Sequence, residues 1–321
     1  MTLADHSKIQ WTDATWNPTT GCTKVSPGCA KCYIVRTPAF RIPGRRFVKG
    51  ATGVRLHADR LDTPLHWRKP RRVFVNSLSD LFHEDVPDAF IDRVFAVMAL
   101  AGQHTFQVLT KRPVRMRDYV TRLGRSVKPL EAIAREMGFT FAFENLSLLP
   151  WPIPNVWLGV SVENQHFADE RIPLLLQTPA AVRFISAEPL LEGVDLHRIQ
   201  NPADKFHASA LQRQHDDNFY EFDASLDWVI VGGESGPGAR PFDLAWARSI
   251  LSQCRAAGVP VFVKQLGAKP FGLCTPTCSI GPHEMLFDDR KGADPNEWPD
   301  DVRVRDFPAD VERQIGVEDD E

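Results

Sequence analysis

Six short apolar runs, separated by longer polar stretches, constrain the fold of this chain more than any other feature. Each run is nearly continuous in hydrophobic side chains, which is the pattern of parallel strands covered on both faces. Helical patterns lie between the runs, and strands that alternate with helices build a parallel sheet. The predicted strands are 72–76, 105–110, 156–161, 182–186, 228–232 and 259–263.

Two of the intervening stretches have clear helical spacing. The first begins after Pro87 and ends at Gly102, and the second begins at Leu244 and ends at Gly258, a residue type that often closes a helix. No obvious dinucleotide-binding fingerprint accompanies these units, which favours a barrel over a Rossmann sheet. We therefore predict the α/β class, as a partial parallel β/α barrel of about six βα units.

The domain boundaries follow from where this alternation holds. It covers residues 1–266, which we interpret as one barrel domain that includes a cysteine loop at 16–33. The polar segment 197–227 breaks the alternation and is predicted to be an inserted loop. Residues 267–321 are rich in Pro, Gly and Asp, so they are predicted to form an irregular acidic tail wrapped on the barrel.

Composition excludes several classes of protein. The chain has 321 residues, of which 43% are hydrophobic and 25% charged, as in ordinary globular proteins. No apolar stretch reaches the length of a membrane span, and the N-terminus lacks the apolar core of a signal peptide. Six cysteines in a chain of this length do not resemble a disulfide framework. We therefore expect no membrane association and a cytoplasmic location.

Three of the cysteines, Cys22, Cys29 and Cys32, lie in one loop with the spacing Cys-x6-Cys-x2-Cys. Such a turn-rich loop lets three thiolates converge on one point, as a metal ion or an iron–sulfur cluster requires. A structural zinc site is normally closed by four ligands. A [4Fe–4S] cluster held by three thiolates instead leaves one iron open to a small molecule, so the number three favours the cluster.

The remaining cysteines give weaker signals. Cys254 falls on the apolar face of the second predicted helix, where a free cysteine packs as a small hydrophobe. Cys274 and Cys278 have the spacing Cys-x3-Cys and could complete a zinc site or bind a second metal, although no histidine stands at finger-like spacing. Zinc held by the three clustered cysteines and a fourth residue such as His57 is the alternative to the cluster.

A glutamate follows each of three successive predicted strands: Glu163, Glu188 and Glu234. The carboxyl ends of barrel strands carry function, so these glutamates are candidates for lining a ligand. The segment Gly232-Gly233-Glu234 is the sharpest of these ends, because two glycines let the backbone approach a ligand closely. A tight turn that needs glycine explains the same two residues equally well.

The other predicted strand ends are polar too, although any strand end lies near water. Their polar residues are Asn76, Ser77, Asp80, Lys111, Arg112, Lys264 and Gln265. His83 is the only histidine directly beside one of these ends. We interpret it as a local hydrogen-bonding residue in preference to a base.

The net charge of −3 conceals an uneven distribution. Residues 31–72 carry 12 Lys and Arg against two Asp, whereas residues 284–321 carry 14 acidic and five basic residues. A basic segment beside a cysteine loop can contact the phosphates of a nucleic acid or a nucleotide. A solvated basic face that docks on the acidic tail of the same chain accounts for the pattern as well.

Several motifs resemble those of an uncharacterised phage and prophage protein family, whose genes often neighbour one for a three-Cys-motif partner protein. The resemblance spans nearly the whole chain. It is carried by 8–18, the three clustered cysteines, 185–191, 232–236, 263–265 and 297–299. It implies the three-Cys-motif partner as a candidate interaction partner.

That family is similar in turn to the radical S-adenosylmethionine superfamily, in which three cysteines hold a [4Fe–4S] cluster and S-adenosyl-L-methionine chelates its fourth iron. The similarity implies Cys22, Cys29 and Cys32 as the ligands, a TIM-barrel-like fold, and an electron donor such as a flavodoxin or ferredoxin. Three features differ from the superfamily. The first two cysteines are three residues further apart than in Cys-x3-Cys-x2-Cys, and Lys31 stands just before the last cysteine, where the superfamily tends to have an aromatic residue; here Tyr33 follows the cysteine instead. The Gly-Gly-Glu segment follows a late strand instead of an early one.

The resemblance also implies a reaction. One electron from the reduced cluster cleaves the cofactor and gives a 5′-deoxyadenosyl radical, which removes a hydrogen atom from a substrate. Glu163, Glu188 and Glu234, together with Gly232 and Gly233, would then help to bind the cofactor or the substrate.

The predicted function is therefore a radical enzyme that modifies or repairs a nucleic-acid base or nucleotide in a phage or mobile element. A photoproduct lyase is one subclass of such enzymes. The alternative is a non-enzymatic zinc-binding protein that interacts with nucleic acids.

Overall fold

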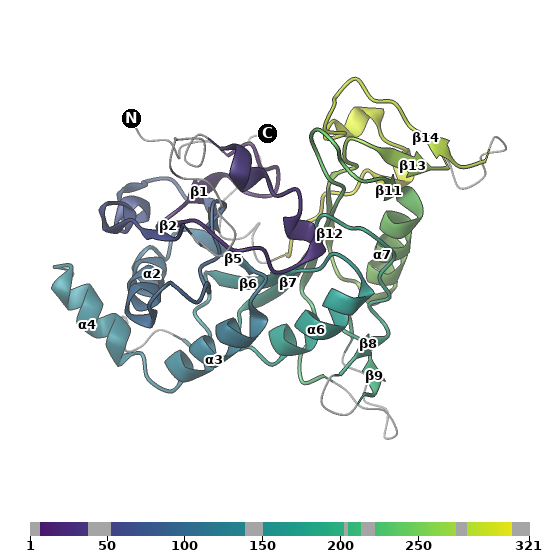
Figure 1. Cartoon of the computed structure of the whole chain (residues 1–321). Helices are drawn as coiled ribbons and strands as arrows, with labels where there is room; N and C mark the ends of the chain where they lie inside the picture. Colours follow the sequence, from purple (N-terminus) through teal and green to yellow (C-terminus); the bar gives the residue numbers. More distant parts are fainter. Residues whose placement is uncertain are drawn as a thin grey trace, which may run out of the picture. The chain divides into compact units, whose positions relative to one another are not determined.

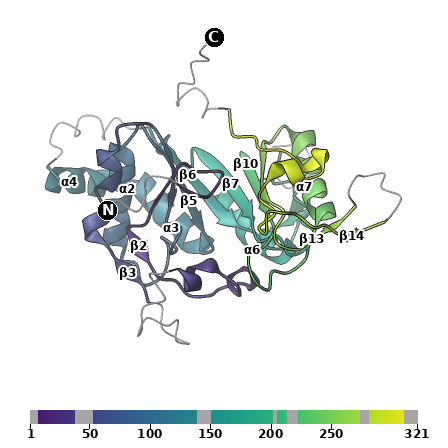
Figure 2. The ribbon, with the colours of Figure 1, turned by 90° about the horizontal axis from the view of Figure 1, so that it is seen from above.

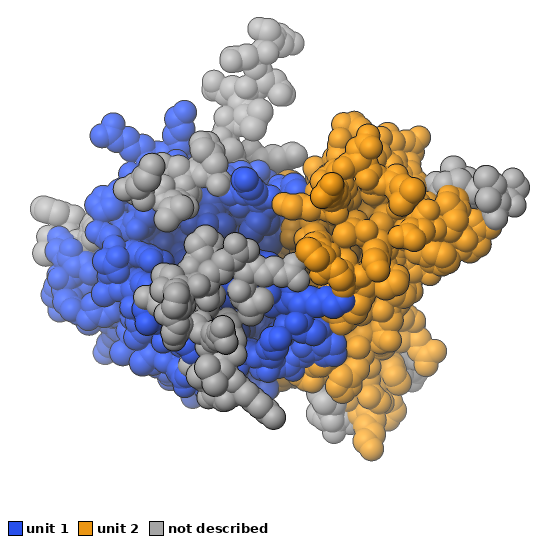
Figure 3. All heavy atoms as spheres, turned by 45° about the horizontal axis from the view of Figure 1, so that its top comes forward, with its two compact units in different colours: residues 1–159, 178–182, 314–321 blue, residues 160–177, 183–313 orange. Residues whose placement is uncertain are grey.

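The computed structural model describes residues 7–37, 53–138, 150–201, 205–212, 222–273 and 281–309 (Figure 1). The chain divides into two compact units (Figure 3). The first comprises residues 1–159, 178–182 and 314–321, and the second comprises residues 160–177 and 183–313. The fold is mixed α/β, as predicted.

A seven-stranded sheet has the strand order β1-β4-β5-β6-β7-β10-β12. Its strands are β1 (Ala14–Trp16), β4 (Arg72–Val75), β5 (Thr105–Thr110), β6 (Val156–Ser161), β7 (Val182–Ala187), β10 (Trp228–Gly232) and β12 (Val261–Gln265). Strand β4 pairs in parallel with β1 and β5 in the first unit, and β10 pairs in parallel with β7 and β12 in the second. All six predicted strands are present, and only β12 begins later than predicted.

Strand β1 is the one strand of this sheet that the sequence pattern does not indicate, because three residues are too few to show a period. Ala14 and Trp16 are buried on either side of the partly exposed Thr15. The indole Nε1 of Trp16 donates to the carbonyl of Arg60 at 2.7 Å, which fixes the strand in place. The cysteine loop therefore follows directly after a strand of the sheet.

Three helices of the first unit follow its strands. Helix α2 (Asp88–Leu100) confirms the first predicted helix, and α3 (Pro113–Gly124) and α4 (Lys128–Glu136) each carry a proline in the first turn, where its missing N–H costs no hydrogen bond. Helices α2 and α4 lie side by side (Figure 1 and Figure 2). The hydroxyl of Tyr119 on α3 donates to Asp92 on α2 at 2.7 Å.

The second unit contains α6 (Gln165–Leu176) and α7 (Leu244–Ala257). The side chain of Asp243 caps α7 by accepting from the N–H of Ala245 at 2.9 Å. Helix α7 ends at Gly258 with a left-handed φ of 69°, as the sequence predicts.

Short strands occur in the two segments predicted to be irregular. Strands β8 (Ile199–Gln200) and β9 (His207–Ala208) pair within the predicted inserted loop. In the tail, β13 (Pro270–Gly272) and β14 (His283–Glu284) join β11 (Phe242–Asp243) in a three-stranded sheet. Among the described residues, no helix combines the length and apolar character that crossing a bilayer requires.

Candidate active site

The cysteine loop is anchored on the ends of β1 and β4 in the first unit. Strand β2 (Thr19–Thr20) follows β1 and pairs in antiparallel with β3 (Arg55–Leu56). Next comes Gly21, whose N–H donates to the carbonyl of Leu78 at 3.1 Å. Gly21 has a φ of +99°, and a Cβ atom on it would lie 2.3 Å from the carbonyl oxygen of Gly53. Only glycine fits there, so the entry of the chain into the loop is fixed.

The thiols of the loop are shielded from water. Burial raises the pKa of Cys22 to about 12 and also raises that of Cys32, and the charge of Cys29 acts on both in the same direction. Cys29 itself is buried at the end of a short 3-10 helix, Pro27–Cys29. Within the described ranges, no three His, Cys, Asp or Glu side chains are grouped closely enough to hold a single metal ion.

The guanidinium of Arg112 connects the cysteine loop to the ends of β4 and β5. Its Nη1 lies 3.7 Å from the Sγ of Cys22 and donates to Asp80 at 3.0 Å. Its Nη2 donates to the hydroxyl of Thr23 at 2.7 Å, and its Nε donates to Glu84 at 3.0 Å. Burial alone lowers the pKa of Arg112, but the charge of Asp80 raises it above the ordinary value. A permanent positive charge therefore lies beside one of the cysteine sulfurs.

His83 supports the same part of the loop. Its Nδ1 accepts from the N–H of Asp85 at 3.0 Å, so in the neutral ring the proton is on Nε2, which donates to the hydroxyl of Thr23 at 2.9 Å. Burial lowers the pKa of His83, which favours this neutral form. The side chain is a local hydrogen-bonding residue, as predicted. The Nε2 of His57, the candidate fourth zinc ligand, lies 2.9 Å from the hydroxyl of Thr20.

Asn76, directly after β4, has an unusual backbone conformation. Its φ is 65°, a left-handed value that non-glycine residues seldom adopt. The side chain is buried, and its Oδ1 accepts from the N–H of Thr19 at 3.4 Å. Its Nδ2 has no hydrogen-bond partner. Strain and a buried free donor at a strand end are features that cluster at functional sites.

In the second unit, each of the three candidate glutamates is already paired with a cation. Glu163 pairs with Arg171 of α6, Glu188 with Lys264 of β12, and Glu234 with Arg240. The first pair is closed to solvent, since Glu163 and Arg171 are 0% and 1% exposed. The other two pairs are partly exposed. An ammonium group of a ligand would therefore compete there with Lys264 or Arg240.

Packing accounts for both glycines of the Gly-Gly-Glu segment. A Cβ on Gly232 would lie 3.3 Å from the carboxyl group of Glu188, and a Cβ on Gly233 would lie 2.5 Å from the carbonyl oxygen of Leu266. The absence of a side chain on Gly232 leaves room for Glu188, directly after β7, to reach Lys264 of β12. Packing alone therefore explains why glycine occupies both positions, and no bound ligand is needed to account for them.

The other predicted cysteines lie apart from the loop. Cys254 is buried on α7, where burial raises the pKa of its thiol to about 12, as expected for a core residue. Cys274 and Cys278 fall outside the described residues.

Three arginines that contact candidate site residues have partners that the sequence does not predict: Arg112, Arg171 and Arg240. Short spacing could have indicated two of these pairs, since Arg171 follows Glu163 by eight residues and Arg240 follows Glu234 by six. Arg112 is expected at a strand end, but its neighbour Cys22 is 90 residues away in the sequence, and no pattern links the two.

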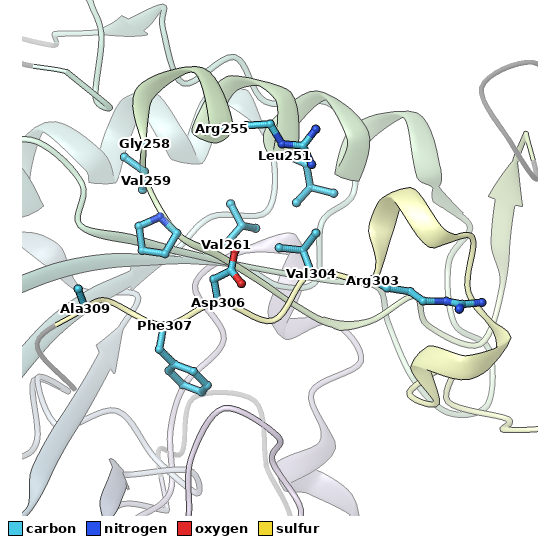
Figure 4. Close-up of a pocket in the computed structure, with 11 residues that line it drawn as sticks. Leu251, Arg255, Gly258, Val259, Val261, Arg303, Val304, Asp306, Phe307 and Ala309 are labelled. Carbon is cyan, nitrogen blue, oxygen red and sulfur yellow. The ribbon is translucent and has the colours of Figure 1, made fainter. Parts of the chain in front are cut away.

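The second unit also has a pocket of about 560 Å³ between α7, the start of β12 and the chain around 303–309 (Figure 4). Its lining is mixed: apolar side chains such as Leu251 and Phe307 stand beside the charged Arg255, Arg303 and Asp306. The pocket lies at the amino end of β12, whereas Lys264 lies near the carboxyl end. None of the predicted site residues lines it.

Comparison with known proteins gives one informative result. A family model described as "Protein of unknown function (DUF5131)" matches residues 6–284. No curated protein and no solved structure matches the chain.

Proposed function

The chain belongs to the DUF5131 family, and we propose that it is an iron–sulfur enzyme of the radical S-adenosylmethionine type, with Cys22, Cys29 and Cys32 as the ligands of a [4Fe–4S] cluster. One observation carries this proposal: three thiols, one buried and two partly buried, lie in a single loop that follows β1 of a parallel sheet. When bound, the cluster would supply one electron to cleave S-adenosyl-L-methionine into methionine and a 5′-deoxyadenosyl radical.

The number of cysteines in the loop favours a cluster over the zinc alternative. A structural zinc site is normally closed by four ligands, whereas a [4Fe–4S] cluster held by three thiolates would leave one iron open to S-adenosyl-L-methionine.

The residues around the loop would stabilise such a cluster. Burial and the charge of Asp80 raise the pKa of Cys22, and Arg112 offsets only part of this effect, so a bound metal would supply the remaining positive charge that the thiolate needs. Hydrogen bonds to ligating sulfurs also tune the reduction potential of a cluster. Thr23 receives hydrogen bonds from Arg112 and His83, so the backbone next to Cys22 is held in position.

The partial β/α barrel is part of the same proposal. Parallel strand pairs joined by a helix, such as β4 and β5 through α2 and β10 and β12 through α7, are the building units of such barrels. The glutamates at the strand ends would contribute to binding only where their ion pairs open, which applies to Glu188 and Glu234.

The proposed substrate is a nucleic-acid base or a nucleotide. Arg55, Arg60, Arg68 and Lys69 of the basic segment are exposed in the first unit and can contact phosphates. A cofactor-cleavage assay with single-stranded and double-stranded oligonucleotides, including ultraviolet-damaged DNA, tests the reaction class and the substrate class together. We expect 5′-deoxyadenosine to form faster in the presence of the true substrate.

Metal analysis tests the central claim. The protein is purified without oxygen, and its iron, sulfide and zinc are measured. We expect a brown protein with about four irons, and alanine variants of Cys22, Cys29 or Cys32 that lack both the colour and cofactor cleavage. The Cys254→Ala variant removes a buried thiol outside the loop and is the matched control. A colourless protein with one zinc ion would instead support the non-enzymatic alternative.

A further inference from the structure

The pocket of about 560 Å³ in the second unit has no part in the function proposed above, although it has the size of a small-molecule site (Figure 4). Pockets for small organic ligands enclose about 300 to 1,000 Å³ and combine apolar walls with a few polar groups that orient the ligand. The apolar walls here are mainly aliphatic and come from Leu251, Val259, Pro260, Val261 and Val304. They suit a ligand with an aliphatic body.

Phe307 also lines the pocket, but two other rings already pack on its ring. The ring centroids of Trp228 and Phe262 lie 5.3 and 5.2 Å from that of Phe307. Figure 4 shows the ring of Phe307 pointing away from α7. Among the lining residues Phe307 is the one aromatic side chain. A flat ligand such as a nucleobase would therefore find little to stack on here, which again favours an aliphatic ligand.

Asp306 places a negative charge at the pocket. Its backbone is fixed on both sides, since its N–H donates to the carbonyl of Val261 at 2.9 Å and its carbonyl accepts from the Nε1 of Trp228 at 2.9 Å. Its side chain is exposed, and within the described residues the carboxylate has no hydrogen-bond or ion-pair partner. The carboxylate is therefore available to a ligand.

The neighbouring charged side chains along the same segment do have partners. Arg303, which also lines the pocket, pairs with Asp300 at 2.9 Å. Asp301 pairs with Arg248 of α7 at 2.6 Å, and Arg305 donates to three backbone carbonyls. A charge left unpaired in this segment is thus the exception.

Arg255 supplies the opposite charge. It lies in the last turn of α7 and is exposed, and its guanidinium has no hydrogen-bond or ion-pair partner in the described part of the chain. Arg255 and Asp306 both line the pocket, yet they do not form an ion pair with each other. The pocket therefore presents a positive and a negative group that are separated, with room for a ligand between them.

We propose that this pocket binds a small zwitterion with an aliphatic body, of the class of free amino acids and short peptides. The carboxylate of the ligand pairs with Arg255 and its ammonium group with Asp306, while its aliphatic part contacts Leu251, Val261 and Val304. Binding needs no bond to form or break and no residue of the cysteine loop. It is therefore independent of the iron–sulfur chemistry proposed above.

Isothermal titration calorimetry of the full chain tests the proposal. The zwitterionic probes are L-leucine and the dipeptide leucyl-leucine, which distinguish an amino-acid site from a peptide site. Two further probes each lack one charge: 4-methylpentanoate has no ammonium group, and 3-methylbutylamine has no carboxylate. We expect a Kd below about 1 mM for at least one zwitterion, and binding of both single-charge probes that is weaker by at least about tenfold.

Two variants remove one charge each from the pocket without changing a buried side chain. Arg255→Met and Asp306→Asn should each weaken binding of the zwitterion by at least about tenfold. Arg255→Met should leave the weaker binding of 3-methylbutylamine unchanged, because that probe has no carboxylate. The controls Lys269→Met and Glu284→Gln remove exposed charges of the same unit outside the pocket, and they should change the affinity by less than about twofold.

Three results would overturn the proposal. In the first, neither L-leucine nor leucyl-leucine binds. In the second, 4-methylpentanoate binds as tightly as the zwitterions, which would make the pocket a site for simple anions. In the third, Arg255→Met and Asp306→Asn bind a zwitterion as tightly as the wild type does, which would place the binding elsewhere on the protein.

Discussion

Glu188, directly after β7, forms an ion pair with Lys264 on β12, and the intervening strand β10 has Gly232 between them. Glu188 and Lys264 are 15% and 18% exposed, so the pair is largely desolvated. A side chain on Gly232 would crowd Glu188 at 3.3 Å, so glycine leaves room for the pair. This relationship gives the Gly-Gly-Glu segment a structural role that can be measured apart from any cofactor.

Alanine at the two glycines should destabilise the protein to different degrees. In Gly233→Ala the new methyl group would meet the backbone oxygen of Leu266 at 2.5 Å, and backbone cannot move aside cheaply. We expect a loss of about 3 kcal/mol. In Gly232→Ala it meets the side chain of Glu188 at 3.3 Å, and we expect about 1 kcal/mol. Urea unfolding measures both, and Gly102→Ala, with nothing within 4 Å, is the control. Equal losses at all three positions would contradict this explanation.

Removal of the Arg112 guanidinium should destabilise the folded protein even when no cluster is bound. Arg112→Met leaves Asp80, whose side chain is 6% exposed, without its cation, although Asp80 keeps hydrogen bonds from Thr110 and Lys111. We expect the free energy of unfolding to fall by about 3 kcal/mol. In the control Arg117→Met, the lost partner is an exposed Asp118, and the loss should stay below about 0.5 kcal/mol. If both variants lose only a little free energy of unfolding, the contacts of Arg112 with Asp80, Glu84 and Thr23 do not hold the loop in place.

His104 should make stability depend on pH. Burial lowers its pKa below the ordinary value of 6.5, and its Nε2 donates to the carbonyl of Pro64 at 3.1 Å. Above pH 6.5 the ring is neutral in both states, and its stabilising contribution is complete. As the pH falls below 6.5, the unfolded chain binds a proton that the folded chain excludes, so stability is lost until the pH has passed the folded pKa.

The variant His104→Phe removes this titration. We expect the free energy of unfolding to decline less steeply below pH 6.5, by up to about 1.4 kcal/mol per pH unit. The variant His166→Phe, at a side chain 75% exposed, should leave the slope unchanged. Urea unfolding at several pH values between about 5 and 8 gives the slopes. The same slope in both variants would argue against the buried ring as the cause.

Asn76 should respond differently to glycine and to alanine. Its φ of 65° costs little for glycine but is unfavourable for alanine. We expect Asn76→Ala to lose about 1 kcal/mol more than Asn76→Gly in thermal or urea unfolding. If the two variants are equally stable, the backbone at the end of β4 is not strained in solution.

The sequence predicts the longer strands and helices well, because each shows its own local pattern of apolar residues. Strands such as 105–110 and 228–232 are continuous apolar runs, and the pattern of a buried parallel strand does not depend on distant residues. Strand β1 could not be predicted, since its three residues are defined by pairing with Val73–Val75 and not by their own composition. The short strands in the tail have the same origin.

The candidate site is less predictable, because its partners are distant in sequence. The spacing of the three cysteines is readable, and so is the succession of glutamates at strand ends. The ion-pair partners of these residues cannot be read from the sequence. Lys264 is 76 residues from Glu188, and only the strand order brings them together. Sequence alone likewise could not decide whether the glycines at 232 and 233 serve a ligand or the packing.

Residues 304–306 cover the edge of the sheet at β12. Strand β12 is the last in the order, and the residues at 304–306 hydrogen-bond along it: the N–H of Val263 donates to Val304 at 2.8 Å, and the N–H of Asp306 donates to Val261 at 2.9 Å. Backbone groups at this border are therefore satisfied by the same polypeptide. A bare border strand would be a template on which further chains could add and grow into fibrils, and these few residues remove that hazard.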